Sequence, residues 1–259
     1  QAVVYWDTTT QEYLAYGRVH AGAPPSTEPV RGCPGASASY RQVGFASTVN
    51  GSLTNWGAVK QIFGFRDLPD CVDVYNNAAV KANNAYLMLP SEFLHYPSDR
   101  ADLPESDGVL DIRLAVSSDG HDFSYVSEEP FVERGVGTLD QNASGTGWHY
   151  SGDWDAGLAF AVRGYAETDR WLVLFYFGSQ MTHGDFGKPW MYHDSALSGI
   201  GRLTLRKDGW FSFDAGPAVG ALTTTAIQLP PKPPGHESHQ QQLTLSVQLN
   251  VLTSVLGSV

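Results

Sequence analysis

Residues 110–125 read L-D-I-R-L-A-V-S-S-D-G-H-D-F-S-Y, and this stretch decides the fold class. Apolar side chains alternate with other side chains over 110–116, which is the period-two pattern of a strand with one buried face. The sequence S-D-G-H at 118–121 supplies a turn, because Gly120 takes a positive φ without steric cost. A second strand begins at Phe123. The stretch therefore predicts a β-hairpin with an aromatic side chain just after its turn.

Two further segments resemble this hairpin. Residues 40–56 contain a turn at Asn50-Gly51, and residues 200–213 contain one at Asp208-Gly209. Shorter strand-like runs lie between the hairpins, at 12–16, 85–89, 157–162 and 171–177. Repeated small antiparallel sheets are typical of a β-propeller, and at about four strands per blade this length suits roughly five blades. We therefore predict an all-β fold, a five-bladed β-propeller over residues 1–225. A β-sandwich with several D-G hairpins is the alternative.

The composition bounds both the fold and the partners. The 259 residues are 42% hydrophobic and include 12 Tyr, 12 Phe and 7 Trp, which favours strands and supports a packed core. The sequence lacks helical periodicity and apolar runs of membrane-spanning length, so membrane insertion is not expected. The formal net charge of −11, without a basic stripe, argues against nucleic acid and anionic membrane surfaces as partners.

Residues 226–259 differ from the rest. Residues 229–242 form a connector that is first proline-rich and then polar, and residues 243–251 alternate like an amphipathic strand. A lone strand of this kind must pair with something. We expect it either to close onto the propeller or to begin a β-sandwich completed by a further domain or by another chain. In the second case the chain is one piece of a larger assembly.

The two cysteines and two glycosylation sequons indicate the compartment. Cys33 and Cys71 both lie in loop-like sequence, and Asn50 and Asn142 each begin an N-x-S sequon. Together they predict a secreted glycoprotein with one disulfide bond, while two free thiols in a cytosolic protein are the alternative. The chain begins at Gln1, which we expect to follow the removal of a signal peptide.

Four long loops are predicted at 21–39, 95–108, 134–154 and 179–198, because these segments have little sequence that would hold a regular strand. They combine aromatic with polar side chains. Aromatic faces stack on sugar rings while Asp, Asn and His bind sugar hydroxyls, so the loops predict a carbohydrate-facing surface.

Carboxylates are the strongest candidates for chemistry. The sequence carries no metal-binding signature, no G-x-S-x-G and no phosphate loop, so no cofactor is expected, although a structural calcium among converging carboxylates stays open. Asp7, Asp73 and Asp155 each lie where an expected blade starts. Sugar hydrolysis needs two carboxyl groups that flank the glycosidic bond, and equivalent blade positions face one channel. The alternative is that each acid caps a turn.

Several motifs resemble five-bladed propeller proteins related to glycoside hydrolase families 43 and 32. They are F-V-x-R-G-x-G at 131–137, W-D-A-G at 154–157, W-L-V-L-F-Y-F-G-S-Q-M-T-H-G at 171–184, Y-L-M-L-P-S-E-F-L-H at 86–95 and D-G-V-L-D-I-R-L-A-V-S-S-D-G at 107–120. The opening V-V-Y-W-D-T-T-T-Q-E-Y-L-A-Y-G-R and G-A-L-T-T-T-A-I near the end also resemble this group, so the likeness extends over 3–225. In such proteins a β-sandwich commonly follows the propeller.

The resemblance implies Asp73 and Asp155 as the acids of a catalytic pair, with His95 and His183 on neighbouring channel-facing loops. Asp7 matches the acid of the first blade. The W-M-N-D-P-N-G, R-D-P and E-C motifs of family 32 are absent, so no general acid is carried over, and Glu92 is expected at the rim or surface.

Two functions follow from these residues. The first is a secreted glycosidase-like protein in which paired carboxylates hydrolyse a glycan. The second is a propeller that binds carbohydrate, or has a structural role, without catalysis.

Overall fold

The computed structural model describes residues 2–22, 39–64, 72–96, 103–104, 107–141, 147–185 and 198–212. The chain divides into two units, Gln1–Lys207 and Asp208–Val259, and apart from residues 208–212 the account below concerns the first. Cys33, Cys71, Asn142 and residues 226–259 lie outside the described residues, so the predicted disulfide, the second sequon and the C-terminal strand stay predictions. The regular structure of the described residues consists of β-strands, which confirms the all-β class.

The first sheet is built by the N-terminal quarter of the chain. It has five antiparallel strands in the order β1-β2-β3-β4, with β5 also paired to β3. Their bounds are β1 Ala2–Asp7, β2 Glu12–Gly22, β3 Ser39–Val49, β4 Ser52–Trp56 and β5 Lys60–Phe63. The predicted Asn50-Gly51 hairpin joins β3 to β4, and both residues have positive φ, 56° and 67°. This is the turn conformation that an Asn-Gly pair favours.

The second sheet has eight strands in the order β10-β9-β7-β8-β13-β14-β15, with β6 paired to β7. Their bounds are β6 Val72–Ala82, β7 Ala85–His95, β8 Gly108–Ile112, β9 Ala115–Ser117, β10 Ser124–Tyr125, β13 Leu158–Glu167, β14 Trp171–Ser179 and β15 Ser198–Arg206. The neighbours are antiparallel except β8 and β13, which form a parallel pair at Leu110 and Leu158. Of the four short strand-like runs predicted from the sequence, three fall within β2, β7 and β14, and the run 157–162 overlaps β13 from Leu158 onward.

The stretch 110–125 does form a hairpin, but its first strand is interrupted. β8 ends at Ile112 and β9 begins at Ala115, and both pair with β7. Pro90 lies opposite the gap and carries no N–H, so it cannot donate to the facing strand. It only accepts, through its carbonyl oxygen, from the N–H of Arg113 at 2.9 Å. The hairpin itself is formed by β9 and β10.

Two other expectations need correction. The prediction that residues 134–154 hold no regular strand is wrong, because they contain a hairpin of β11 (Gly137–Gln141) and β12 (Trp148–Gly152). Glycine permits this tight pairing, because a Cβ on Gly137 would lie 2.6 Å from the carbonyl oxygen of Ser151. In the 200–213 segment, Asp208 has the positive φ of a turn, 59°, but residues 210–212 form no return strand.

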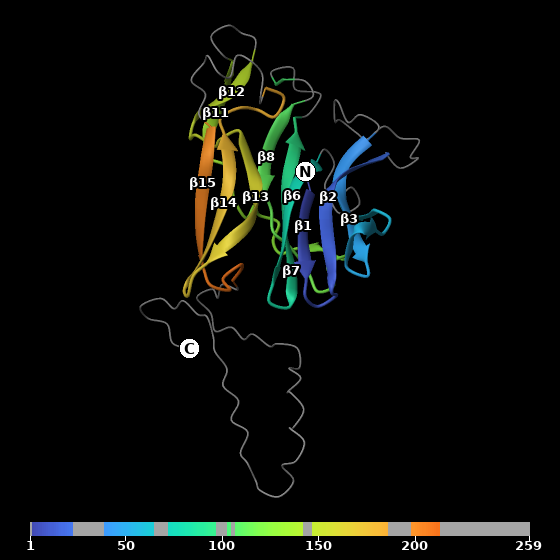
Figure 1. Ribbon diagram of the computed structural model, residues 1–259. Coiled ribbons are helices and arrows are strands. Elements are labelled where there is room, and N and C mark those ends of the chain that lie inside the picture. Colours follow the sequence, from blue (N-terminus) through green and yellow to red (C-terminus); the bar gives the residue numbers. More distant parts are fainter. Residues whose placement is uncertain are drawn as a thin grey trace, which may run out of the picture. The chain divides into compact units, whose positions relative to one another are not determined.

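One apolar core joins the two large sheets. It contains Tyr16, Val43 and Phe63 from the first sheet, Met88 from the second and Phe123 from the turn between β9 and β10, among other buried side chains. Figure 1 shows β1, β6 and β13 beside one another in the middle of the ribbon, and contacts join β6 to both β1 and β13. β1, β6 and β13 are the first strands of three groups that follow one another in the sequence, β1–β5, β6–β10 and β13–β15. A propeller requires such successive antiparallel groups. The closed ring and its five blades stay predictions.

No helix in the described part of the chain has the length and apolar character needed to cross a bilayer.

We expect Tyr16→Phe to destabilise the protein by about 1 to 2 kcal/mol, because it leaves a buried carbonyl without its donor. The Tyr16 side chain is fully buried, and its hydroxyl donates to the carbonyl oxygen of Gly120 at 3.0 Å, which ties the first sheet to the turn after β9. The measurement is urea unfolding. Tyr13→Phe is the control, since the Tyr13 hydroxyl makes no hydrogen bond among the described residues. Equal stability of the two variants would contradict this expectation.

Candidate functional site

Asp73 lies at the start of β6, where its backbone pairs with Phe93 of β7. The strand then bulges between Val74 and Asn76, so Tyr75 is an extra residue in the ladder. Only 4% of Asp73 is exposed. A buried carboxylate is costly unless it is paired, and its partners therefore define the site.

Two residues bind the Asp73 carboxylate. Nη1 of Arg41 donates to Oδ2 at 2.8 Å, the backbone N–H of Arg41 donates to Oδ1 at 3.3 Å, and Nε2 of His95 lies 3.1 Å from Oδ2. Burial alone would raise the pKa of Asp73, but the hydrogen bonds and charges of His95 and Arg41 hold it below its usual value. Asp73 is therefore ionised at neutral pH. We call Asp73, Arg41, His95, His183, Arg18 and Tyr75 the Asp73 centre.

His95 has one ring nitrogen left over. Because an ionised carboxylate only accepts hydrogen bonds, Nε2 of His95 must carry the proton that it shares with Asp73. Its other nitrogen, Nδ1, is buried and has no hydrogen-bond partner in the described structure. The side chain is only 7% exposed. A buried polar atom without a partner is rare in folded proteins, so this nitrogen marks a place where a ligand group could bind.

His183 packs against the same strands. Its ring centroid lies 4.1 Å from that of Phe93 and 4.6 Å from that of Tyr75. Burial lowers the pKa of His183 to about 4, and the positive charges of Arg41, His95 and Arg18 act in the same direction. His183 is therefore a neutral imidazole at pH 7.

Asp107 holds the backbone around His183 in place. Its carboxylate accepts hydrogen bonds from Thr182 Oγ1 and from the backbone N–H of Gly184, on either side of the histidine. The N–H of His183 donates to the carbonyl oxygen of Gly108 at 3.0 Å. A Cβ on Gly184 would lie 2.8 Å from Cγ of Asp107, so the close approach requires glycine. Burial raises the pKa of Asp107 against the lowering effect of these donors.

Two arginines share one aromatic ring at the centre. The guanidinium carbon of Arg18 lies 4.8 Å from the centroid of the Tyr75 ring, and that of Arg41 lies 5.5 Å from it. Arg41 also lies 5.7 Å from the ring of Phe93. Cations over aromatic faces are attracted by the ring quadrupole, which orders both guanidinium groups.

Asp155 lies in a different environment. It is 7% exposed, and its Oδ2 accepts a 2.6 Å hydrogen bond from the hydroxyl of Tyr176 on β14. Among the described residues, no hydrogen bond or ion pair joins Asp155 to Asp73. The structure thus brings Asp73, His95 and His183 together, whereas the pairing of Asp155 with Asp73 across one substrate stays a prediction.

Asp7 lies at the far end of the strands. It ends β1, and its carboxylate binds Nζ of Lys81, near the end of β6, at 2.6 Å and the hydroxyl of Tyr86 at 2.5 Å. Asp73 lies at the beginning of β6, so Asp7 is not part of the same centre. Burial opposes ionisation, but Lys81, Tyr86 and the N–H of Thr9 lower the pKa of Asp7 to about 2.

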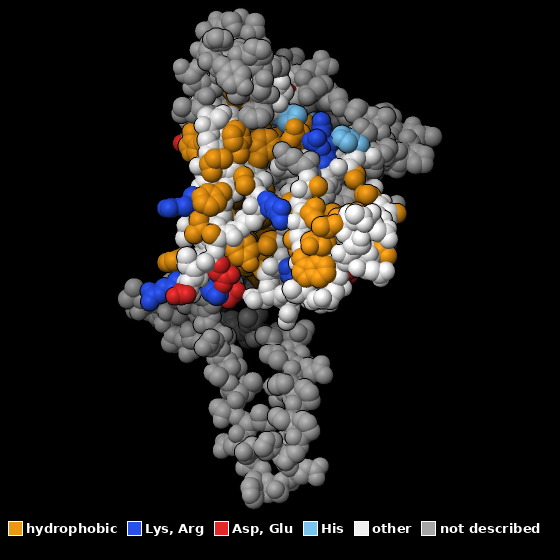
Figure 2. Space-filling model, in the orientation of Figure 1, with side chains coloured by type: hydrophobic (Ala, Val, Ile, Leu, Met, Phe, Trp, Pro, Cys, Tyr) orange, Lys and Arg blue, Asp and Glu red, His pale blue; other side chains and the backbone are white. Residues whose placement is uncertain are grey.

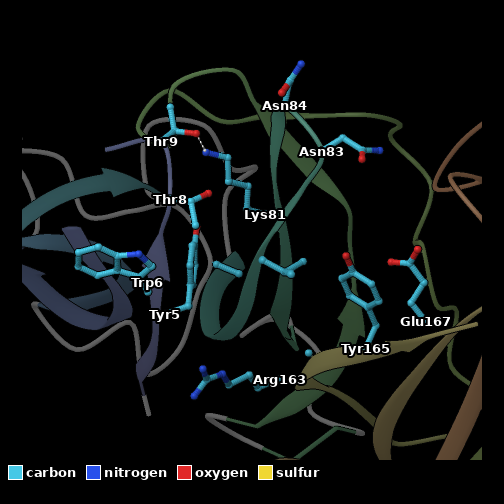
Figure 3. Close-up of a pocket in the computed structure, with 13 residues that line it drawn as sticks. Tyr5, Trp6, Thr8, Thr9, Lys81, Asn83, Asn84, Arg163, Tyr165 and Glu167 are labelled. Atoms are coloured by element: carbon cyan, nitrogen blue, oxygen red, sulfur yellow. Dashed lines mark hydrogen bonds between the residues drawn. The ribbon is translucent and has the colours of Figure 1, made fainter. Parts of the chain in front are cut away.

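A pocket of ≈ 750 Å³ opens beside Asp7, between the ends of β1, β6 and β13. Figure 3 shows its side chains, which include the rings of Tyr5, Trp6 and Tyr165 and the polar groups of Lys81 and Arg163. Thr8, Thr9, Asn83, Asn84 and Glu167 add hydroxyl, amide and carboxylate groups. We call it the strand-end pocket. Its mixture of aromatic and hydrogen-bonding groups suits a sugar.

The prediction of Glu92 at the rim or surface is wrong. Only 3% of the residue is exposed. Its carboxylate accepts hydrogen bonds from the hydroxyl of Tyr125 and from Nη1 of Arg113. Burial raises its pKa, and the Tyr125 hydrogen bond and the Arg113 charge only partly offset this effect.

Sequence reasoning alone does not select Arg18, Arg41 or Asp107. Each arginine lies in a strand of the first sheet, more than thirty residues from Asp73, and only the register of β2 and β3 brings them to it. An isolated arginine in an alternating strand carries no motif. The segment before β8 is recognisably acidic, but nothing in it distinguishes Asp107 from its acidic neighbours.

Asn50 is exposed at its turn, and its glycosylation stays a prediction. The described residues contain no group of three or more His, Cys, Asp or Glu side chains arranged to hold a metal ion. The suggested calcium stays an open prediction.

No protein family profile and no curated protein sequence matches the chain. Solved structures do resemble the chain. A complex described by the names BT0996 and RGII is 14% identical to it with a TM-score of 0.47, and the matched region covers 79% of this chain and 45% of the other. A structure described as "Glycoside hydrolase" is 13% identical with a TM-score of 0.47, covering 87% and 49%. An N-acetylgalactosamine deacetylase from F. plautii in complex with blood group B trisaccharide is 13% identical with a TM-score of 0.46, covering 79% and 49%. The chain spans about half the length of these structures.

We expect the stability of the protein to fall as the pH falls from 6.5 to about 4, because the folded state holds His183 neutral while the unfolded chain protonates it. One such group contributes at most about 1.4 kcal/mol per pH unit. His183→Phe keeps an aromatic ring and removes the titration, so urea unfolding across this range should become less pH-dependent.

Asp7→Asn is the matched control. This variant should leave the pH dependence of stability between pH 6.5 and 4 unchanged and remove the pH dependence between 3.8 and about 2. The pKa of Asp7 is lower in the folded state than in the unfolded chain, so the ionised carboxylate stabilises the folded state above pH 3.8, and this contribution is lost as the pH falls to about 2. An unchanged slope between 6.5 and 4 in His183→Phe would contradict the expectation.

Proposed function

We propose that the protein acts on glycans at the Asp73 centre, as a secreted glycosidase-like protein on a five-bladed propeller scaffold. One observation carries the proposal. A buried, ionised carboxylate at the start of a central strand is bound by Arg41 and by His95, whose Nδ1 has no partner among the described residues. A sugar hydroxyl both donates and accepts hydrogen bonds, so it suits this ring nitrogen.

The protonation state of Asp73 suggests its chemical role. Glycoside hydrolysis uses one ionised carboxylate as base or nucleophile and one protonated carboxyl as acid. The lowered pKa of Asp73 suits the ionised role. In this proposal Asp155, held by Tyr176, supplies the second carboxyl group.

The neutral His183 would add a hydrogen-bonding ring next to Asp73. Its position is fixed by Asp107 and by the rings of Phe93 and Tyr75. A rigid imidazole beside an ionised carboxylate can orient a sugar hydroxyl without adding charge.

The arrangement of the strands supports the scaffold. β1, β6 and β13 each begin an antiparallel group and run beside one another, as the inner strands of successive blades do. The secreted location, the Cys33–Cys71 disulfide and the glycans on Asn50 and Asn142 belong to the same proposal.

Binding without hydrolysis is the second candidate. It is favoured by the separate partners of the two acids, since Asp73 is bound by Arg41 and His95 whereas Asp155 is bound by Tyr176. The strand-end pocket offers the aromatic and amide groups that a binding protein needs.

We expect Asp73→Asn to lower turnover of the responsive substrate by at least about 100-fold, the lower end of what a positioned acid or base contributes. Asp155→Asn should have a comparable effect. The measurement is hydrolysis of an aryl-glycoside and oligosaccharide panel, with glycan-array binding in parallel.

Asp119→Asn is the control. The Asp119 carboxylate lies in the turn after β9 and accepts hydrogen bonds from the backbone N–H groups of His121 and Asp122 at 2.8 and 2.9 Å, and neither donor belongs to the Asp73 centre. It should lose stability but keep activity. Glycan binding without turnover in the wild type would support the second candidate, and the absence of both would overturn the proposed function.

A further inference from the structure

We propose that the Asp73 centre takes a glycan that carries an anionic group, a carboxylate or a sulfate, and that Arg18 binds this group. The inference rests on the proposed function and names the class of sugar. It follows from the unbalanced charge of the centre.

The charges at the centre do not cancel. Arg41 is matched by Asp73 at 2.8 Å. Arg18 contacts no acidic side chain in the described structure, and its guanidinium makes one long hydrogen bond, from Nη1 to the carbonyl oxygen of Tyr75 at 3.4 Å. Arg18 therefore adds a positive charge that no acidic side chain of the described residues balances, although the whole chain has a formal net charge of −11.

The Arg18 guanidinium is also oriented. Its carbon lies 4.8 Å from the centroid of the Tyr75 ring, and the side chain is partly buried. The attraction between the cation and the ring restrains the guanidinium, and the hydrogen bond from Nη1 to Tyr75 is its only hydrogen bond among the described residues. The N–H edge of a guanidinium matches two oxygens of a carboxylate or sulfate in a bidentate pair.

The rest of the centre experiences the same positive field. Among the charges that act on His183, those of Arg41, His95 and Arg18 outweigh that of Asp73. Figure 2 shows Lys or Arg side chains and His side chains close together near the top of the coloured surface, beside apolar side chains. Positive potential at a partly buried site raises the local concentration of an anionic ligand.

The anion should be presented singly. The overall negative charge of the chain repels a polyanion such as a nucleic acid. A short glycan with one anionic group near a neutral ring can place that group on Arg18 and a hydroxyl on Nδ1 of His95.

The experiment is isothermal titration calorimetry with matched sugars. The probes are a disaccharide with one uronic acid residue, the methyl ester of that disaccharide, and a monosulfated disaccharide with its unsulfated form. We expect each anionic probe to bind at least about 10-fold more tightly than its neutral match, because a charged hydrogen bond contributes about 1.5 to 3 kcal/mol. The preference should weaken as salt is raised.

Variants assign the effect to Arg18. Arg18→Gln should weaken binding of the anionic probe by about 10- to 100-fold and leave the neutral probe unchanged, and Arg18→Lys should restore part of the loss. Arg202→Gln, an exposed residue of β15, is the control. Circular dichroism and urea unfolding confirm that each variant folds.

The outcomes separate this inference from the proposed function. Equal affinity for anionic and neutral probes, or an Arg18→Gln variant with unchanged preference, overturns the inference and leaves the proposed function standing. Failure of every glycan to bind overturns both. Preference for the sulfated probe alone supports the inference and identifies sulfate as the anionic group.

Discussion

The architecture depends on a missing hydrogen-bond donor in the middle of β7. Pro90 cannot donate to the strand that faces it, so that strand stops after Ile112 and resumes at Ala115. The interruption frees the two pieces to take different second partners: β9 pairs with β10, and β8 with β13. A single proline therefore lets β7 contact β9, which pairs with β10, and also β8, which pairs with β13. Without these pairings β10 and β13 would each have an unpaired edge exposed to solvent.

The same strand organises the Asp73 centre. β7 ends with Phe93, Leu94 and His95, and the pairing of β6 places Asp73 opposite Phe93. Ionised carboxylates are rarely buried without partners, and Arg41 reaches Asp73 from the neighbouring sheet. The centre is thus assembled from β2, β3, β6, β7 and the segment after β14, and no local segment contains it.

Local patterns predict the strands well and the long-range contacts poorly. Alternation and the Asn50-Gly51 turn identify β3 and β4 because these features depend on neighbouring residues alone. The burial of Glu92 depends on Arg113 and Tyr125, which a strand-to-loop position does not reveal. The β11–β12 hairpin escapes prediction because glycine-rich sequence looks irregular until its partner is known. The resemblance to glycoside hydrolase propellers predicts that Asp73 and His95 lie near each other. The position of Arg18 beside them depends on the register of β2 against β3, which the sequence does not reveal.

The seam between β8 and β13 has a kinetic consequence. It consists of one parallel pair, a 3.3 Å hydrogen bond from Leu110 to Gly157 and the packing of Leu110 on Leu158. The hairpins on either side close short loops, which form within microseconds, whereas this junction joins residues nearly fifty positions apart. The hairpin groups should therefore assemble first and dock afterwards. Native-state hydrogen exchange should then report β13–β15 as an opening unit distinct from β6 and β7.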